Sequence, residues 1–234
     1  MSETTLLALP RLEPAQAQKH VTVNEALQSL DLLVQLAVES RTQADPPAAP
    51  ADGARHIVPP GGTGAWAGHA GEIAAWRDGV WRFLTPREGW RAAVRDEGRM
   101  LTWAAGRWRD TLVTGPAGEG IAVETLAETH QLAPGATSDT GVPIPERTLL
   151  LGITCLVAAP VTGVASFDVG IAGEPQRFGT GIGTGLNAQL DAPLAPVPWM
   201  AATPIRFTAQ GGTFTGGTLR VAAHVLRLRI PDFL

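Results

Sequence analysis

The feature that most constrains the fold is a pattern of paired tryptophans that occurs twice between residues 71 and 110. Residues 71–83 and 98–110 share this pattern at an offset of 27 positions. The copies align Gly71 with Gly98, Ile73 with Met100, Trp76 with Trp103, Gly79 with Gly106, Trp81 with Trp108 and Arg82 with Arg109. In each copy a strand-like run ends at a glycine-containing turn and a second run begins. Because glycine supplies the positive φ of a tight turn, we predict two β-hairpins whose tryptophans pair across the strands.

Two interpretations are open for these rings, which are four of the seven tryptophans in the chain. Exposed on a small β platform, they would suit sugar binding, because an indole face stacks on the apolar face of a pyranose. Buried, they would form the core of a small sheet, and each ring would remove ~150–250 Å² from water. At ~25 cal/mol per Å², that burial contributes roughly 4–6 kcal/mol per ring as an upper bound. Core packing is the favoured interpretation.

Composition narrows the classes of function. The 234 residues include 27 glycines and 19 prolines, and only 17% are charged. This mixture favours short strands, turns and linkers over long helices. A net charge of −4 gives no basic field, so we expect no nucleic-acid partner. The single cysteine, Cys155, excludes an intrachain disulfide, and no zinc-ligand spacing occurs, so we expect no metal or cofactor. We predict that Cys155 is a buried, inert thiol.

The sequence also bears on localisation. Residues 1–10 lack a basic segment, and their apolar run is too short for a signal peptide. No stretch reaches the ~18 apolar residues that a membrane span requires. We therefore expect synthesis in the cytoplasm, without a signal peptide and without membrane insertion.

Residues 1–45 are predicted to form an attachment arm and an oligomerisation helix. Two prolines keep the arm from forming a regular helix. A capping box at Thr22-Val-Asn-Glu25 predicts a helix over residues 22–41. Its apolar residues recur at the 4-3-4-3 spacing of a coiled-coil seam, namely Val23, Leu27, Leu30, Val34 and Ala37. Two heptads associate weakly alone, so the helix needs sister helices or a sheet beside it. An amphipathic helix lying on its own domain is the alternative.

Three stretches together resemble a known family. They are residues 14–27 (PAQAQKHVTVNEAL, with the motif AQAQKHVTVNEAL), 64–76 (GAWAGHAGEIAAW) and 81–90 (WRFLTPREGW). Residues 10–110 resemble a domain of formally unknown function found in tail-fibre and spike proteins of alphaproteobacterial phages, prophages and gene transfer agents. The resemblance implies a structural virion protein, made in the bacterial cytoplasm, that carries a cell-binding tip. The family offers no established catalytic residues.

The remaining chain is divided by composition. Residues 46–115 form the tryptophan-rich β-hairpin module, and residues 116–145 form a linker in which 121–132 is a short helix. Residues 146–234 are predicted to be a jelly-roll-like β-sandwich head, because short alternating runs are joined by turn-rich segments. Such an ending also resembles the trimeric receptor-binding heads of phage fibres. The fold class is therefore mainly β.

The last strand of the head changes phase. Leu219, Val221, Ala223 and Val225 share one face, whereas Leu226, Leu228 and Ile230 share the other. A shift of one residue moves every following side chain to the other face of the sheet. We therefore predict either a bulge near Val225 and Leu226 or a strand that passes into a second contact surface.

A candidate saccharide site lies in two predicted loops, residues 173–187 and 190–203. It comprises Trp199, Arg177, Asn187, Gln189 and Asp191. An exposed Trp199 would stack on a sugar ring, and the polar groups would bind hydroxyls.

We find no catalytic constellation and expect no enzyme. There is no GxSxG elbow and no P-loop, and the glycine-rich run 179–185 lacks a surrounding βαβ unit. The hypothesis is a homotrimeric tail fibre or head spike that attaches to a tail baseplate or capsid-vertex protein through its N-terminal region. Three weak sites on one particle would bind host surface polysaccharide with high avidity. The alternatives are a connector without receptor binding and a capsule-degrading glycan hydrolase, which needs two opposed carboxylates.

Overall fold

The computed structural model describes residues 17–232, and the chain divides into two compact units. Unit 1 takes the chain up to residue 111 together with residues 116–118, and unit 2 takes residues 112–115 and the chain from residue 119. The predicted attachment arm falls largely on residues 1–16, outside the described residues. The prediction of a mainly β chain with an N-terminal helix is confirmed.

The helix α1 (Lys19–Leu33) begins before the predicted capping box and ends earlier than predicted. Its N-cap is Gln18, which has a left-handed backbone (φ 56°) and makes no side-chain capping bond. Thr22 is buried within the helix, so the capping-box prediction is wrong. The chain turns extended at Val34 because the next residues join a sheet and bury Leu36 and Val38 in the core of unit 1.

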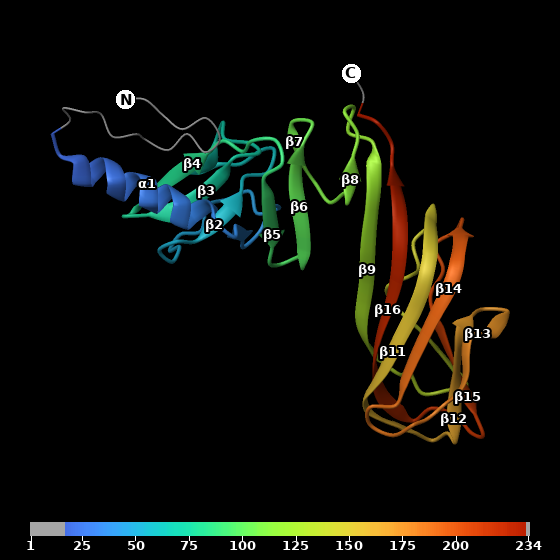
Figure 1. The fold of residues 1–234 in the computed structure, drawn as a ribbon. Coiled ribbons are helices and arrows are strands. Elements are labelled where there is room, and N and C mark those ends of the chain that lie inside the picture. The colour runs from blue at the N-terminus through green and yellow to red at the C-terminus, as the bar shows by residue number, and fades with distance from the viewer. Residues whose placement is uncertain (1–16, 233–234) are drawn as a thin grey trace. The chain divides into compact units, whose positions relative to one another are not determined.

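Unit 1 contains two small sheets built on the repeated pattern (Figure 1). The first has the order β2 (Arg55–Ile57), β3 (Ile73–Arg77), β4 (Val80–Leu84). The second has the order β1 (Ala37–Val38), β5 (Arg91–Val94), β6 (Arg99–Ala104), β7 (Arg107–Arg109). Only the pair β1–β5 is parallel. A short 3₁₀ turn, η1 (Gly64–Trp66), precedes β3.

Both predicted hairpins are present with the predicted pairing of rings. Trp76 lies opposite Trp81 and Trp103 lies opposite Trp108. The ring centroids are 5.1 and 5.5 Å apart, and the rings meet edge to face. The two turn residues have positive φ in each hairpin, 51° and 78° in the first and 50° and 72° in the second. Positive φ at both positions is the type I′ geometry whose twist matches that of the strands.

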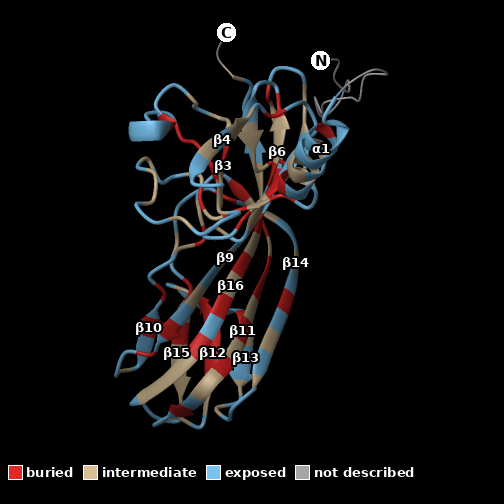
Figure 2. Ribbon diagram, turned by 90° about the vertical axis from the view of Figure 1, so that its left-hand side faces the viewer, coloured by how far each residue is buried: buried red, intermediate tan, exposed pale blue. Residues whose placement is uncertain are grey.

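Unit 2 is a β-sandwich of two antiparallel sheets (Figures 1 and 2). The larger sheet has the order β14 (Gln189–Trp199), β11 (Thr148–Thr162), β16 (Gly216–Arg229), β9 (Gly120–Gln131), β8 (Val113–Thr114). The smaller has the order β10 (Thr137–Asp139), β15 (Arg206–Gln210), β12 (Ser166–Ile171), β13 (Glu174–Ile182). One shared core joins them and includes Leu150, Ile153, Phe167, Phe207 and Leu219.

Three predicted segments of unit 2 are wrong in secondary structure. Residues 121–132 were expected to be a helix in a linker, but they belong to β9, whose residues alternate between buried and exposed. The predicted loops 173–187 and 190–203 contain most of β13 and β14. Strand β14 tolerates Pro193, Pro196 and Pro198 because it is an edge strand, where a missing N–H costs no ladder bond.

An irregularity is present next to Val225, as predicted, but its extra residue lies on β11 and not on β16. The register of β16 with β9 runs without a break from Thr218 to Arg229. In the pairing of β11 with β16, the register shifts between Leu150, which lies opposite Val225, and Gly152, which lies opposite His224. Strand β16 therefore keeps one phase, and Leu228 points to the face opposite the core, where it is 67% exposed.

Candidate functional site

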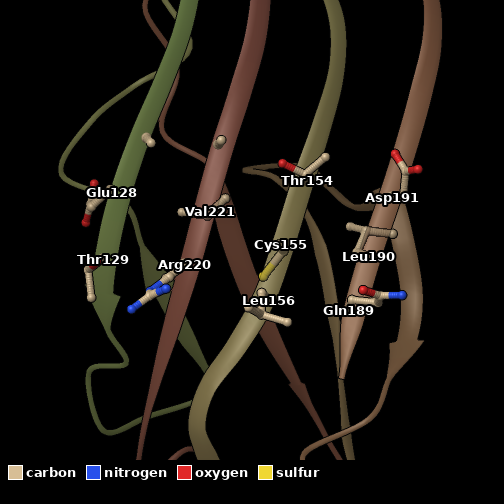
Figure 3. Close-up of a pocket in the computed structure, with 12 residues that line it drawn as sticks. Glu128, Thr129, Thr154, Cys155, Leu156, Gln189, Leu190, Asp191, Arg220 and Val221 are labelled. Atoms are coloured by element: carbon tan, nitrogen blue, oxygen red, sulfur yellow. The ribbon is translucent and has the colours of Figure 1, made fainter. Parts of the chain in front are cut away.

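The outer face of the five-stranded sheet of unit 2 carries a shallow groove of about 550 Å³, which we call the outer groove (Figure 3). Four strands line it, contributing Ala127, Glu128, Thr129, Thr154, Cys155, Leu156, Gln189, Leu190, Asp191, Arg220, Val221 and Ala222. Side chains alternate along each strand. Cys155 and Val221 are buried in the sandwich core, so Thr154, Leu156 and Arg220 point to the opposite, open face.

The register of the sheet arranges the floor of the groove in two rows. One row contains Gln189, Leu156, Arg220 and Thr129, and the next contains Asp191, Thr154, Ala222 and Ala127. Cross-strand neighbours of this kind have Cβ atoms ~4.5–5.5 Å apart. An amide, a carboxylate and a guanidinium are thus spread across a rigid surface.

Some polar side chains of the outer groove form hydrogen bonds within the protein, and others do not. Thr154 Oγ1 lies 3.0 Å from His224 Nε2, and His224 Nδ1 lies 3.2 Å from Thr125 Oγ1. Within residues 17–232, no hydrogen bond or ion pair engages the side chains of Gln189, Asp191 or Arg220. These three groups can therefore bind polar groups of a ligand, such as sugar hydroxyls.

Cys155 takes no part in this chemistry. Burial raises the pKa of its thiol to about 12, so the predicted inert thiol is what the structure shows.

The predicted saccharide residues are not all in one place. Gln189 and Asp191 meet in the outer groove, whereas Trp199 lies at the other end of β14. Trp199 is only 6% exposed, and the guanidinium carbon of Arg177 lies 5.0 Å from its ring centroid. The expectation of an exposed Trp199 is therefore wrong, because its ring packs within the core of the sandwich. Asn187 has φ 65° in the turn before β14.

Sequence reasoning missed the basic residue of the groove. Arg220 stands between Leu219 and Val221, two core residues of β16. An arginine in such an alternating strand faces away from the core, and this signal is present in the sequence. Arg220 lies beside Thr129 and Leu156 because β16 pairs with β9 and β11, which are distant in the sequence, and the sequence alone does not give these pairings.

Three of the predicted oligomerisation residues, Val23, Leu27 and Leu30, lie on α1, and Val34 is the residue that caps its C-terminal end. Val23, Leu27 and Val34 are 39%, 57% and 60% exposed, and Leu30 is half-buried. The opposite side of the helix buries Thr22 and Leu32. Ala37 is not part of the stripe, because it lies in β1. We call Val23, Leu27, Leu30 and Val34 the α1 stripe.

No group of three or more His, Cys, Asp or Glu side chains within residues 17–232 could hold a metal ion. No helix in the same residues has the length and apolar character to cross a membrane.

Comparisons with known proteins give one family match. Residues 23–109, less than half of the chain, match the model of a family described as "Protein of unknown function (DUF2793)". No curated protein sequence matches the chain. A solved structure, "Cyanophage Pam1 capsid asymmetric unit", matches 51% of this chain and 93% of its own chain at 21% identity. The TM-score of this match is 0.31.

Proposed function

We propose that this chain is a structural protein of a phage-like particle, a tail fibre or head spike, that self-associates and binds host surface polysaccharide. The family match covers the stretch that resembles such virion proteins. The observation that carries the proposal is the α1 stripe, an apolar surface at coiled-coil spacing that the described residues of the chain leave open to solvent.

Self-association would bury the α1 stripe against the same stripe of other copies. Full burial of one aliphatic side chain contributes about 1.5–3 kcal/mol, and Leu27 and Val34 are both more than half exposed. Two heptads alone give weak association, so a second apolar surface is needed. The proposed assembly is a homotrimer, attached through its N-terminal region to a tail baseplate or capsid-vertex protein.

Unit 2 offers such a second surface. On the outer face of β9 and β16, Ile121, Val123 and Leu228 are 37%, 53% and 67% exposed. On the inner face of the same strands, Glu124 accepts hydrogen bonds from Arg227 and Arg229 at 3.1 and 3.0 Å. The charges are thus paired on the inner face while the apolar side chains face solvent, which is typical of a surface that contacts another molecule.

Glycan binding is proposed for the outer groove. Its amide, carboxylate and guanidinium groups can donate hydrogen bonds to sugar hydroxyls and accept them, and Leu156 offers an apolar contact. Each single site would be weak, and several copies on one particle would bind a repeating polysaccharide with far greater avidity.

Glycan hydrolysis is less favoured by the geometry. The carboxylates nearest the groove, Glu128 and Asp191, stand on β9 and β14 with two strands between them, and Glu128, whose register partner is the core residue Val221, points to the other face of the sheet from Asp191. Three strand spacings separate them by about 14 Å, beyond the ~5–10 Å of a glycosidase pair. Glu128 also accepts hydrogen bonds from the backbone N–H groups of Gly141 and Val142, at 3.2 and 2.7 Å. We therefore propose binding without catalysis.

Light scattering of the purified full-length chain tests the proposal. We expect a trimer mass for the natural sequence and a monomer mass for Leu27→Asp, since a carboxylate in the seam opposes burial of the α1 stripe. Glu25→Gln, at an exposed position of the same helix, should leave the trimer intact. A monomeric natural protein at micromolar concentration would refute the fibre proposal. A trimer that does not bind host polysaccharide would favour the alternative, a connector without receptor binding.

A further inference from the structure

The outer groove carries two opposite charges that the protein does not pair. Arg220 of β16 and Asp191 of β14 are both exposed, and among the residues that the structure describes neither side chain has a hydrogen bond or an ion pair. The other charged residue of the groove, Glu128, points to the inner face, where its Oε1 lies 3.0 Å from His130 Nδ1. The open face of the groove therefore presents one guanidinium and one carboxylate.

These two charges are too far apart to neutralise each other. Strand β11 lies between β16 and β14, so two strand spacings of ~4.8 Å, about 10 Å in all, separate the positions of Arg220 and Asp191. The two residues also lie in different rows of the register, beside Leu156 and Thr154 respectively. In Figure 3 the guanidinium of Arg220 lies on the β9 side of β16, away from Asp191. Because an ion pair requires an N–O distance within about 4 Å, both groups stay available to a ligand.

The floor between the two charges is uncharged. Leu156 of β11 lies between Arg220 and Gln189 and offers an apolar contact to the C–H groups of a sugar ring. The side-chain amide of Gln189 can donate and accept hydrogen bonds beside it. Strand β11 is paired on both sides over this stretch, so its backbone is held in place before a ligand arrives. A preorganised surface of this kind loses little conformational freedom on binding.

Opposite charges at the two sides of one groove discriminate between ligands by charge. A guanidinium binds a carboxylate through two parallel N–H donors, and a carboxylate accepts hydrogen bonds from an ammonium group. A purely anionic saccharide would pair with Arg220 and leave Asp191 unpaired, and a purely cationic one would do the reverse. A neutral saccharide would pair with neither. Only a ligand that carries both charges pairs with both groups.

We propose that the outer groove selects a zwitterionic saccharide, in which a carboxylate and an unacetylated amine occur in the same repeat. The carboxylate binds Arg220, a sugar ring lies against Leu156, and the ammonium group binds Asp191. This inference rests on the proposed glycan binding by the outer groove, and it names the class of glycan that the groove takes.

Isothermal titration calorimetry on the full-length chain at pH 7 tests the inference. The probes are three hexasaccharides with one backbone, which alternates glucuronate with glucosamine. The first keeps both charges, the second has its amines acetylated and is anionic, and the third has its carboxylates reduced to alcohols and is cationic. At ~10 mM salt, where the screening length is ~30 Å, we expect the zwitterionic form to bind about fivefold more tightly than either of the others, because each of them lacks one of the two ion pairs.

Two variants assign the charges. In Arg220→Gln, the zwitterionic and cationic forms should bind equally, because the partner of the carboxylate is gone. In Asp191→Asn, the zwitterionic and anionic forms should bind equally, because the partner of the ammonium group is gone. Both positions are exposed, so neither change threatens the fold. Arg82→Gln, at an exposed position of β4 in unit 1, is the control and should leave the relative affinities of the three forms unchanged.

The outcomes separate this inference from the proposed function. A zwitterionic form that binds no more tightly than the anionic or the cationic one, or a preference that survives both variants, would overturn the inference and leave glycan binding intact. If none of the three forms binds although host polysaccharide does, the assigned class of glycan is wrong. If host polysaccharide does not bind either, glycan binding itself is refuted.

Discussion

Asp168 is a buried carboxylate of unit 2 whose replacement has a calculable effect on stability. Asp168 of β12 is fully buried, and its two oxygens tie β12 to β13 and β15. Its Oδ1 accepts hydrogen bonds from Thr180 Oγ1 at 2.8 Å and from the Gly181 N–H at 2.9 Å. Its Oδ2 accepts from the side-chain amides of Gln176 and Gln210 at 2.9 and 2.7 Å.

The change to test is Asp168→Asn, which replaces one accepting oxygen by an NH₂ donor. That donor would face the two glutamine amides, so two hydrogen bonds to a charged group are lost. Such bonds contribute about 1.5–3 kcal/mol each, and part of the loss is regained if the glutamines turn, so we expect a net destabilisation of about 3 kcal/mol. For a unit of this size that lowers Tm by about 10 °C.

Scanning calorimetry at pH 7 measures the unfolding of unit 2. Asp191→Asn is the matched control, because the same chemical change on the exposed face should shift Tm by no more than about 2 °C. If Asp168→Asn unfolds at the same temperature as the natural protein, the assigned role of Asp168 is wrong.

The pH dependence gives a second test of the same residue. Burial by itself would raise the pKa of Asp168, but the four hydrogen bonds outweigh it and lower the pKa below its ordinary value. A carboxyl with a lowered folded-state pKa stabilises the fold above its unfolded pKa of about 3.9, and this contribution is lost as pH falls through the folded pKa. The difference between the natural protein and Asp168→Asn should therefore shrink below about pH 4.

Three further outcomes are expected. Burial lowers the pKa of His56 in spite of the carboxylates of Glu39 and Asp96, so unit 1 should lose stability as pH falls below about 6.5, and His56→Gln should remove that loss in pH-dependent calorimetry. Gly170→Ala should destabilise unit 2 by more than about 2 kcal/mol, because a Cβ there would overlap the carbonyl oxygen of Glu174; urea unfolding with an unchanged midpoint would contradict this. Arg220→Gln should weaken binding of host polysaccharide to the assembled protein severalfold in a pull-down assay without changing its light-scattering mass, and unaltered binding would exclude the outer groove.

The tryptophan hairpins could be predicted from sequence because their information is local. Two-residue turns with glycine set the register, and the register sets which rings meet. The alternation of Ile205 and Phe207, or of Leu219 and Val221, likewise identified core faces, since each of these residues is buried.

Strand β9 was missed because polar residues occupy its core face. Glu124 is buried against Arg227 and Arg229, which lie more than a hundred positions along the chain. His130 is buried too, with its Nε2 2.8 Å from Ser138 Oγ and its ring stacked on Phe207. A polar residue at a core position breaks the apolar alternation, and only its distant partners make that position acceptable.

The candidate sites depended on the same long-range information. The sequence predicts Gln189 and Asp191 as candidate binding residues, but Arg220 joins them only through the pairing of β11 with β14 and β16. Trp199 was expected at the surface because glycine and proline around it suggested a loop. In the structure these prolines occupy an edge strand, and the ring fills the sandwich interior.

The prolines of β14 also affect whether the protein aggregates through its sheet edge at high concentration. A long exposed edge strand can form backbone hydrogen bonds with a strand of a neighbouring molecule. Repeated pairing of this kind builds an open-ended fibril. Pro193, Pro196 and Pro198 remove donors along the margin formed by β14. At these positions the backbone of a neighbouring molecule cannot continue the sheet, which opposes growth into a fibril.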